Sequence, residues 1–411
     1  MEFRDGNYLI QGLNVQDICA EFDTPLYVYD AEKILLQYSR LKNAFDGVDL
    51  KIKYAVKALT NQAILKLLRK AGSGVDVVSI QEVHLALKAG YKGSDIMFTP
   101  SCTDFEEIRE AIKIGTTVNI DSIPYLEKFG KEYGNSYPCC IRINPHIDAG
   151  GNIKIMTGHK ESKFGISIDQ VEEVYEVVKK YGISVAGLHI HSGSDFKSPD
   201  AFVKAAEVLF DLSERFPDLQ FLDLGSGFKV AYKEGDHTTD IEALGKKMSE
   251  AFNAFCDKYG RKLQLWFEPG KFLVSECGYF FVKTNVVKPT PACTFVGVGS
   301  GLNHLIRPMM YNAHHDIINV SNPSGAKQKY KVVGYICETD TFGSDVELSE
   351  VRENDILALK NAGAYGFSMS SNYNSRFRPA EVLVYNKKAH LIRKRETMED
   401  LLRNQVEVDI D

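Results

Sequence analysis

The sequence predicts an α/β fold: a TIM-type (β/α)8 barrel joined to a second, mainly β domain. Short runs rich in Val, Ile and Leu alternate with helical stretches from about residue 50 to residue 270. The runs show little polar alternation, which is typical of parallel strands buried on both faces. Polar residues or glycines follow most of the runs, as at the carboxyl ends of barrel strands. An open, doubly wound sheet is the less favoured alternative.

Eight segments are the candidate barrel strands: KIKYAV (51–56), GVDVVS (74–79), IMFTP (96–100), TVNIDS (117–122), CCIRIN (139–144), VAGLHIHS (185–192), FLDLGS (221–226) and LQLWFEP (263–269). Between them, residues 61–72, 79–90 and 104–115 carry apolar side chains at helical spacing, and each segment ends in Gly, a common helix stop. This strand–helix alternation indicates βα units.

The pattern changes after residue 275, where β-rich runs are separated by turns with few helices. The segment EVLVYNKKAHLIRK, residues 381–394, is typical of a β-hairpin around Asn386–Lys388. A chain of 411 residues is long for one core, so two domains are expected. We predict a barrel domain over 26–273 and a Greek-key-like β-sandwich or barrel over 274–411, to which residues 1–25 add a strand.

Composition and charge exclude several classes of function. The net charge of -6 is mild and spread along the chain, so neither nucleic acid nor an anionic membrane is expected as a partner. No apolar run approaches the ~20 residues of a membrane helix, and the start MEFRDGNYLIQG lacks the features of a signal peptide. The eight cysteines show no zinc spacing and no disulfide framework, so we expect a cytosolic protein without a structural metal.

Two strand ends carry the residues with the clearest chemistry. Lys57 closes the first candidate strand in YAVKA, where bulk water is hard to reach. Burial favours the neutral amine that Schiff-base chemistry requires, although a rim lysine extending into solvent is an equal alternative. Glu268 closes the last strand in FEPGK, where its carboxylate could pair with a protonated pyridine nitrogen and make the ring a better electron sink.

The strands between them end in groups suited to a flat, phosphorylated ligand. His191 could stack on a ring, and Ser194 could bond a phosphate, whereas His189 is expected to be a core histidine. The triplet Gly225–Ser226–Gly227 could present backbone N–H groups to an anion. Three further strand-end residues rank second, because such residues are more often structural: Asp76, Arg142 and Asn144.

The β domain contributes a second set of candidates. Cys337 and Glu338 are predicted at a strand end in GYICETD, and Tyr365 lies in the glycine-flanked turn NAGAYG. Arg307 and Tyr311 stand four residues apart in LIRPMMY. Considered one at a time, Cys337 is expected to be a buried cysteine, Tyr365 a turn residue and Arg307 a surface residue. Together the groups suit an amino acid with a second charged end.

Ten motifs in fixed order carry a family resemblance: YAVKA, DVVS-x-x-E, RINP, SKFGIS, GLHIHSGS, LGSGF, EPG, LIRPMMY, ICE and GAYG. Over essentially its whole length the chain resembles the diaminopimelate decarboxylases, which belong to the alanine-racemase/ornithine-decarboxylase (fold type III) group of pyridoxal-phosphate enzymes. The resemblance implies decarboxylation of meso-2,6-diaminopimelate to L-lysine and CO2, the last step of lysine biosynthesis. It also implies a homodimer whose active sites are shared between subunits.

The resemblance assigns roles to individual residues. Lys57 would bond covalently to pyridoxal 5'-phosphate, His191 would stack on its ring and Glu268 would pair with the ring nitrogen. The phosphate region would be held by the glycine triplet together with residues 268–271, including Gly270 and Lys271. Cys337 would be the proton donor, contributed across the dimer interface. The far end of the substrate would be bound by Arg307, Tyr311 and Glu338, while Tyr365 would contact both cofactor and substrate.

The sequence departs from the family pattern at three positions. Lys271 stands where the family usually has Arg after EPG; it keeps the charge and loses the planar bidentate fork, so cofactor or substrate contact there is in question. The glycine triplet has serine at its centre, which should leave backbone donors available. Leu59 replaces the usual Asn after YAVKA. None of these changes removes an indispensable group.

Three other functions compete with this prediction. The nearest rival is a decarboxylase of ornithine, lysine or another basic amino acid; Glu338 and the LIRPMMY segment favour a substrate with a distal carboxylate. A racemase would need a tyrosine acid on the opposite face and has little use for a thiol donor. A non-catalytic pyridoxal-phosphate-binding homologue is disfavoured because the lysine, the glutamate and the cysteine are all present.

Overall fold

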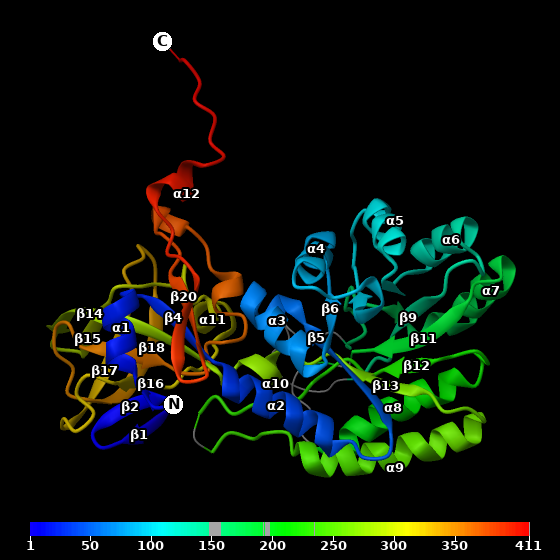
Figure 1. Cartoon of the computed structure of the whole chain (residues 1–411), viewed down its shortest axis with the longest axis horizontal. Coiled ribbons are helices and arrows are strands. Elements are labelled where there is room, and N and C mark those ends of the chain that lie inside the picture. Colours follow the sequence, from blue (N-terminus) through cyan, green and yellow to red (C-terminus); the bar gives the residue numbers. More distant parts are fainter. Residues whose placement is uncertain (148–157, 192, 194–197, 234, 411) are drawn as a thin grey trace. The chain divides into compact units, whose positions relative to one another are not determined.

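The computed structural model describes residues 1–147, 158–191, 193, 198–233 and 235–410. The chain forms two compact units (Figure 1). The first, here called the β unit, comprises Met1–Ile34, Tyr232–Gly235 and Val274–Asp411. The second, called the barrel unit, comprises Leu35–Ala231 and Asp236–Leu273.

The barrel unit is built on a closed ring of eight parallel strands. In ring order they are β5 (Asp49–Ala55), β6 (Gly74–Val77), β7 (Ile96–Phe98), β8 (Thr117–Ile120), β9 (Cys139–Asn144), β11 (Val185–Ile190), β12 (Phe221–Asp223) and β13 (Gln264–Phe267). The ring closes because β13 pairs with β5 and β8 pairs with β9. The short strand β10 (Ile166–Ser167) adds to the end of β9. The predicted barrel is therefore confirmed, with a strand in every predicted segment.

Helices alternate with these strands in the sequence and surround them (Figure 1). They are α2 (Ala31–Ala44), α3 (Gln62–Ala71), α4 (Ile80–Lys88), α5 (Phe105–Ile114), α6 (Ile123–Glu132), α7 (Val171–Tyr181), α8 (Pro199–Ser213), α9 (Ile241–Tyr259) and α10 (Lys271–Val274). Their ends follow from local chemistry. Asn61 caps α3 by accepting from the Ala63 N–H, and Asp104 caps α5 in the same way. Gly72 and Gly115 end these two helices in the left-handed conformation that glycine adopts readily.

Large side chains fill the barrel toward the amino ends of its strands. Phe221 and Trp266 stack with their ring centroids 3.7 Å apart. They pack in a buried cluster with Met97, Cys140 and Ala186. The Lys53 amine lies 4.3 Å from the Trp266 ring and donates to the Asp95 carbonyl oxygen, and burial lowers the pKa of Lys53 to about 8. This packing leaves the carboxyl ends of the strands for chemistry.

The β unit contains a large sheet with the strand order β18-β17-β15-β14-β4-β20-β21, while β19 pairs with β14 and β16. These strands are β4 (Leu26–Asp30), β14 (Gly278–Pro289), β15 (Thr294–Val298), β16 (Ile317–Asn319), β17 (Lys327–Val333), β18 (Thr341–Ser349), β19 (Ile356–Leu359), β20 (Ala380–Tyr385) and β21 (Lys388–Arg393). The predicted hairpin is confirmed, since β20 and β21 pair antiparallel around Asn386 and Lys387, both with positive φ.

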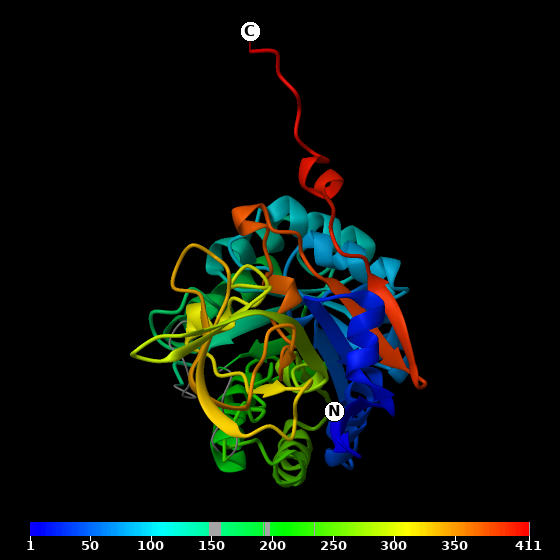
Figure 2. The same ribbon diagram turned by 90° about the vertical axis from the view of Figure 1, so that its left-hand side faces the viewer.

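A small sheet and three helices also belong to the β unit. A separate sheet is formed by β1 (Glu2–Arg4), β2 (Asn7–Ile10) and β3 (Leu13–Asn14). The helix α1 (Val15–Phe22) lies against the large sheet, as Figure 2 shows. Val15, Ile18 and Cys19 of this helix join a core cluster with Leu26, Val28, Phe281, Val382 and Val384. The short helices α11 (Arg307–Tyr311) and α12 (Met398–Leu402) follow later in the chain.

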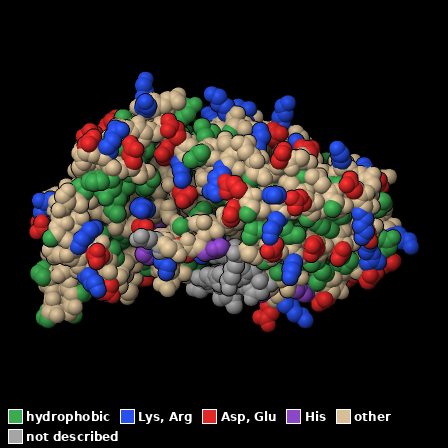
Figure 3. Space-filling view, turned by 90° about the horizontal axis from the view of Figure 1, so that it is seen from below, with side chains coloured by type: hydrophobic (Ala, Val, Ile, Leu, Met, Phe, Trp, Pro, Cys, Tyr) green, Lys and Arg blue, Asp and Glu red, His purple; other side chains and the backbone are tan. Residues whose placement is uncertain are grey.

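The surface is polar and carries charges of both signs. On the face shown in Figure 3, lysine and arginine side chains are interspersed with aspartate and glutamate. Among the described residues, no helix combines the length and the apolar character that a bilayer-spanning segment requires.

We predict that Gly187→Ala destabilises the barrel, because a Cβ at this position of β11 would overlap the Phe221 ring. Overpacking of this kind costs about 1–3 kcal/mol. The free energy of unfolding, measured in urea, should therefore fall, and the loss should shrink when Phe221→Leu is also present. Equal losses in the two backgrounds would contradict this explanation.

Candidate active site

The amine of Lys57 and the carboxylate of Asp76 meet at the carboxyl ends of neighbouring strands. Lys57 lies in the 3-10 turn Val56–Ala58 directly after β5, and its Nζ is 3.3 Å from Asp76 Oδ2. The Lys57 side chain is 45% exposed, whereas that of Asp76 is 1% exposed. Of the two equal alternatives, this exposure favours the rim lysine that extends into solvent, because the turn carries the side chain past the strand end. Burial and the negative charge of Glu268 raise the pKa of Asp76.

Backbone hydrogen bonds bring Glu268 next to these groups. The Glu268 N–H donates to the Gly225 carbonyl oxygen at 2.6 Å. The Ala55 N–H donates to the Pro269 carbonyl oxygen at 3.3 Å. The segment after β13 is thereby tied to the ends of β12 and β5 on either side. This places the predicted Glu268 and the predicted Lys57 on the same rim of the barrel.

Glu268 belongs to a buried cluster with Asp223 and His189. One ligand atom from each side chain lies within 4.8 Å of the others, and His189 Nε2 is 3.1 Å from Glu268 Oε2. Burial raises the pKa of both carboxyl groups, and the negative charge of Glu268 helps to raise that of Asp223 well above its ordinary value. Two carboxyl groups at this range favour one shared proton, so the pair carries about one negative charge.

Glu268 retains an acceptor that the described residues do not satisfy. Its Oε1 atom is buried and has no hydrogen-bond partner among them. A buried carboxylate oxygen without a donor is costly, so this atom is expected to accept a hydrogen bond from a bound group. The neighbouring His189 is fully buried, as predicted for a core histidine.

Arg142 gives the site a positive charge that keeps both histidines neutral. This residue of β9 is buried, and its guanidinium lies 5.1 Å from the Phe164 ring. Burial, followed by the charges of Arg142 and Lys57, lowers the pKa of His191 well below its ordinary value. The pKa of His189 is lowered for the same reasons. Both imidazoles are therefore neutral near pH 7.

The glycine triplet is shaped by the approach of His191. The Ser226 N–H donates to His191 Nδ1 at 3.2 Å, which fixes that nitrogen as an acceptor. A Cβ on Gly225 would lie 2.5 Å from His191 Nδ1 and 2.9 Å from the Ile190 carbonyl oxygen. The positive φ of Gly225, 63°, also favours glycine. Gly227 follows with φ 141°.

The remaining predicted residues of the barrel unit follow β13 and β11. Gly270 is buried, and Lys271 is partly buried and begins α10. Ser194 lies outside the described residues, as do residues 148–157. Asn144 donates to the His159 carbonyl oxygen at 3.0 Å and accepts from the His146 N–H at 3.1 Å. Its contacts are therefore structural.

In the β unit, Arg307 contacts two polar side chains that the sequence analysis did not identify, Tyr232 and His315. Its Nη1 donates to the Tyr232 hydroxyl at 3.0 Å and lies 3.4 Å from His315 Nε2. His315 Nδ1 is 2.8 Å from the Lys360 carbonyl oxygen, so Nδ1 donates there and Nε2 accepts from Arg307. Arg307 is only 8% exposed, which corrects the expectation of a surface arginine. Tyr311 is partly buried at the other end of α11, one helical turn away.

Cys337 and Glu338 lie on a loop rather than at the predicted strand end, because β17 already ends at Val333. Cys337 is exposed, so the expectation of a buried cysteine is also wrong. Asn374 Nδ2 donates to Cys337 Sγ at 3.3 Å, and the Tyr373 hydroxyl donates to Glu338 Oε1.

Asp340 fixes the conformation of this loop. Its two carboxylate oxygens accept from the Leu302 N–H at 2.7 Å and from the Ile336 N–H at 3.0 Å. A Cβ on Gly301 or Gly334 would overlap Asp340 Oδ2, so both positions require glycine. The carboxylate thus sets the path of the backbone directly before Cys337.

Tyr365 occupies a tight turn, as predicted, with φ 57°. Its neighbours explain the glycines of this turn. A Cβ on Gly363 would overlap the Val274 carbonyl oxygen, and one on Gly366 would overlap the Ala362 carbonyl oxygen. The Tyr365 side chain is partly buried.

Each unit thus brings together its own predicted residues. The barrel unit gathers the set around Lys57, Asp76, His191 and Glu268, and the β unit places Arg307 with Tyr311 and Cys337 with Glu338. Five supporting residues were not predicted as site residues: Asp223, His189, Tyr232, His315 and Asp340. Only Asp223 had a usable signal, an acid on a buried strand two residues before the glycine triplet.

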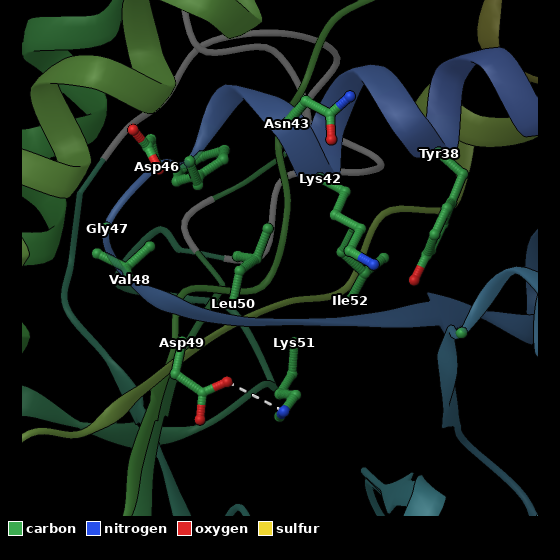
Figure 4. Close-up of a pocket in the computed structure, with 12 residues that line it drawn as sticks. Tyr38, Lys42, Asn43, Asp46, Gly47, Val48, Asp49, Leu50, Lys51 and Ile52 are labelled. Carbon is green, nitrogen blue, oxygen red and sulfur yellow. Dashed lines mark ion pairs between the residues drawn. The ribbon is translucent and has the colours of Figure 1, made fainter.

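A pocket lies at the opposite end of the barrel from this cluster (Figure 4). Its lining runs from the last turns of α2 into the start of β5, with Gly72 beside it. Asp49 and Lys51 form a 3.0 Å ion pair in its wall. The amino ends of barrel strands serve stability in this architecture, and the lining includes no predicted site residue within the described part of the chain.

Comparisons with known proteins agree with this arrangement. The sequence profile described as "Pyridoxal-dependent decarboxylase, pyridoxal binding domain" matches residues 31–275. A diaminopimelate decarboxylase of Methanothermobacter thermautotrophicus is 36% identical over 410 residues, covering 97% of this chain and 96% of the relative. One of Pseudomonas aeruginosa is 35% identical, covering 97% of each chain. The crystal structure of a Helicobacter pylori diaminopimelate decarboxylase complexed with L-lysine has a TM-score of 0.88 at 34% identity, covering 95% of this chain and 98% of that one.

We predict that His315→Gln reduces the loss of stability in acid. Burial and the Arg307 charge lower the pKa of His315 to about 3. Below the ordinary histidine pKa of about 6.5, His315 therefore binds a proton in the unfolded chain and stays neutral in the folded chain. Stability therefore falls as pH drops through this window, by about 2 kcal/mol between pH 6.5 and 4.5 for this group. Urea unfolding at the two pH values should show a correspondingly smaller loss in the variant.

The matched control for this prediction is His314→Gln, which changes the exposed neighbouring histidine. That variant should keep the wild-type loss. If His315→Gln also loses as much stability as the wild type, the titration of His315 is not the cause.

Proposed function

The chain belongs to the diaminopimelate decarboxylases, a family of pyridoxal-dependent decarboxylases, and we propose that it converts meso-2,6-diaminopimelate to L-lysine and CO2. The observation that carries this proposal is the buried acceptor Oε1 of Glu268, on the same barrel rim as the ion-paired Lys57. A lysine amine and an unsatisfied buried carboxylate are the two groups that a pyridoxal cofactor requires of a protein.

The residues of the barrel unit fit pyridoxal phosphate, the cofactor of this family. Lys57 would hold it through its amine, and His191, with its Nδ1 bonded to Ser226, offers a fixed flat face. Glu268 Oε1 would accept from the ring nitrogen. The bound cofactor supplies an electron sink for the charge left behind by CO2. The resemblance assigns the phosphate region to the Gly225–Gly227 triplet together with residues 268–271, which include Gly270 and Lys271. Ser194, which lies outside the described residues, is a further candidate for the phosphate.

The charge state of the acid cluster suits this assignment. The raised pKa of Asp223 keeps a proton on that group, so Glu268 can hold the negative charge. The neutral His189 donates to Glu268 Oε2 and leaves Oε1 available. Asp76 holds the Lys57 amine at 3.3 Å, which fixes its position between turnovers.

The β unit would supply the groups for the distal end of the substrate. The buried Arg307, oriented by Tyr232 and His315, presents a planar guanidinium that suits a carboxylate. Tyr311 and Glu338 would complete the recognition of a second amino-acid centre. Tyr365 would contact both cofactor and substrate.

We propose that Cys337 donates the proton that replaces CO2, and that it does so across a homodimer interface. Its thiol is exposed in the single chain and held by Asn374 on a loop that Asp340 fixes. An exposed thiol on a fixed loop suits a site that a second subunit completes. The proposed compartment is the cytosol, where the eight free cysteines would stay reduced.

A substrate panel tests the proposed reaction. Purified protein with pyridoxal phosphate should release CO2 and lysine from meso-diaminopimelate, and none from the other isomers of diaminopimelate or from ornithine, lysine and arginine. Lys57→Ala should abolish turnover, while Lys51→Ala, at the other end of the same strand, should retain it. Release of CO2 from ornithine but not from diaminopimelate would overturn the proposal in favour of a basic amino-acid decarboxylase.

Replacing Cys337 with Ala should lower kcat by about 10²-fold or more, the scale of a lost general acid. The absorbance of the bound cofactor should be unchanged, because the barrel unit holds it. Cys102→Ala is the matched control, since Cys102 is the other exposed cysteine, and it should retain full activity. An unchanged rate in Cys337→Ala would mean that another group delivers the proton.

A further inference from the structure

The last residues of the chain form an exposed tail with the pattern of a β-strand. Residues 405–410 read QVEVDI, so apolar and acidic side chains alternate with a period of two. Val406, Val408 and Ile410 are 85%, 69% and 92% exposed. Figures 1 and 2 show this tail running out beyond α12. An extended tail would place the three aliphatic side chains on one face and Glu407 and Asp409 on the other.

The composition of the tail differs from that of a segment that simply stays in solvent. Disordered termini are generally poor in β-branched apolar residues. Here all three exposed apolar residues are β-branched, the type that favours strands. The tail therefore has the sequence of a strand and lacks the sheet that a strand needs.

The β unit offers a sheet edge with matching features. β21 ends the path of the large sheet, so its outer edge carries no further strand among the described residues. Val382 and Val384 of β20, which belong to the buried core cluster, pair with Leu391 and Ala389 of β21. Leu391 is nevertheless 46% exposed. The core on this face of the sheet is therefore left uncovered at its last strand.

The two strands are complementary in length, apolar face and charge. β21 has six residues, as does the segment 405–410. One face of β21 carries Ala389, Leu391 and, at its end, Arg393, and the aliphatic face of the tail would continue the core against Ala389 and Leu391. The other face carries Lys388, His390 and Ile392, and its lysine lies opposite the acidic face of the tail.

We propose that the carboxyl-terminal tail of one chain adds as a strand to the β21 edge of a second copy of the chain. The donor's own β21 is a poorer target, because the tail leaves α12 in a direction away from it (Figures 1 and 2). The start of α12 is held in place, since Glu396 accepts from the Arg378 N–H at 2.8 Å and a capping box of Thr397 and Asp400 begins the helix. The inference rests on the self-association proposed above and is independent of the chemistry.

Zero-length cross-linking of two complementary chains tests this pairing. One chain carries Glu407→Gln and Asp409→Asn, and the other carries Lys387→Gln, Lys388→Gln and Lys394→Gln. Neither chain can then link its own tail at 407 or 409 to its own hairpin. After co-production and treatment with a carbodiimide, peptide mass mapping should find residue 407 or 409 of the second chain joined to a hairpin lysine of the first. Absence of that link overturns the proposal.

A proline substitution shows whether the link depends on strand pairing. Val408→Pro in the second chain removes a backbone donor and should lower the yield of the link about fivefold or more. Val408→Thr keeps the N–H and the β-branched shape, and should change the yield by less than about twofold. Equal yields from the two variants would show chance proximity of charged chains and would also overturn the proposal.

Decarboxylation is measured on the same preparations, so the two proposals fail separately. An active enzyme that gives no link between chains contradicts only the strand addition. A link in a protein that does not act on diaminopimelate contradicts only the proposed function.

Discussion

The barrel depends on the compensation of charges buried at the carboxyl ends of its strands. Asp76, Asp223 and Glu268 are 1%, 0% and 7% exposed, and each comes from a different strand or strand end. Carboxyl groups this deep are tolerated only when cations, protons or hydrogen bonds offset their charge. Lys57, directly after β5, and Arg142 of β9 supply the positive charge. Since the five side chains converge only when β13 pairs with β5, closure of the ring and compensation of these charges occur together.

The sequence was sufficient for the barrel because the signals for parallel strands are local. A buried strand is recognisable from its own composition, and the rule that chemistry lies at the carboxyl ends then selects Lys57, His191 and Glu268. The rule states which residues share a rim and not which atoms touch. Asp223 and Glu268 are 45 residues apart, and Tyr232 and Arg307 are 75 apart, so no local pattern could reveal those contacts. Exposure was equally hidden, because the turn after β5 decides how far Lys57 reaches.

In the β unit, hydrogen bonds from neighbouring groups position the candidate residues. Arg307 keeps its charge below the surface because two neutral acceptors, the Tyr232 hydroxyl and His315 Nε2, receive its N–H groups. The Lys360 carbonyl oxygen holds His315 in the tautomer that can accept. Asp340 takes two backbone N–H groups and fixes the loop of Cys337. In each case an unpredicted neighbour orients a predicted group, and beside Asp340 close approach also requires Gly301 and Gly334. Supporting residues of this kind carry weak sequence signals because tyrosine, histidine and aspartate are common in many roles.

The neutrality of His189 decides whether Glu268 can serve a bound ring. A protonated imidazole would form an ion pair with Glu268 Oε2 and draw the carboxylate's charge away from Oε1. Burial and the Arg142 charge lower the pKa of His189 far enough to prevent this, so the imidazole contributes only a neutral hydrogen bond at 3.1 Å. Arg142 thus acts on Glu268 through His189 as well as directly, where its charge opposes the rise in the pKa of Glu268. With the shared proton on Asp223, the single negative charge of the cluster stays on Glu268, whose Oε1 atom is buried.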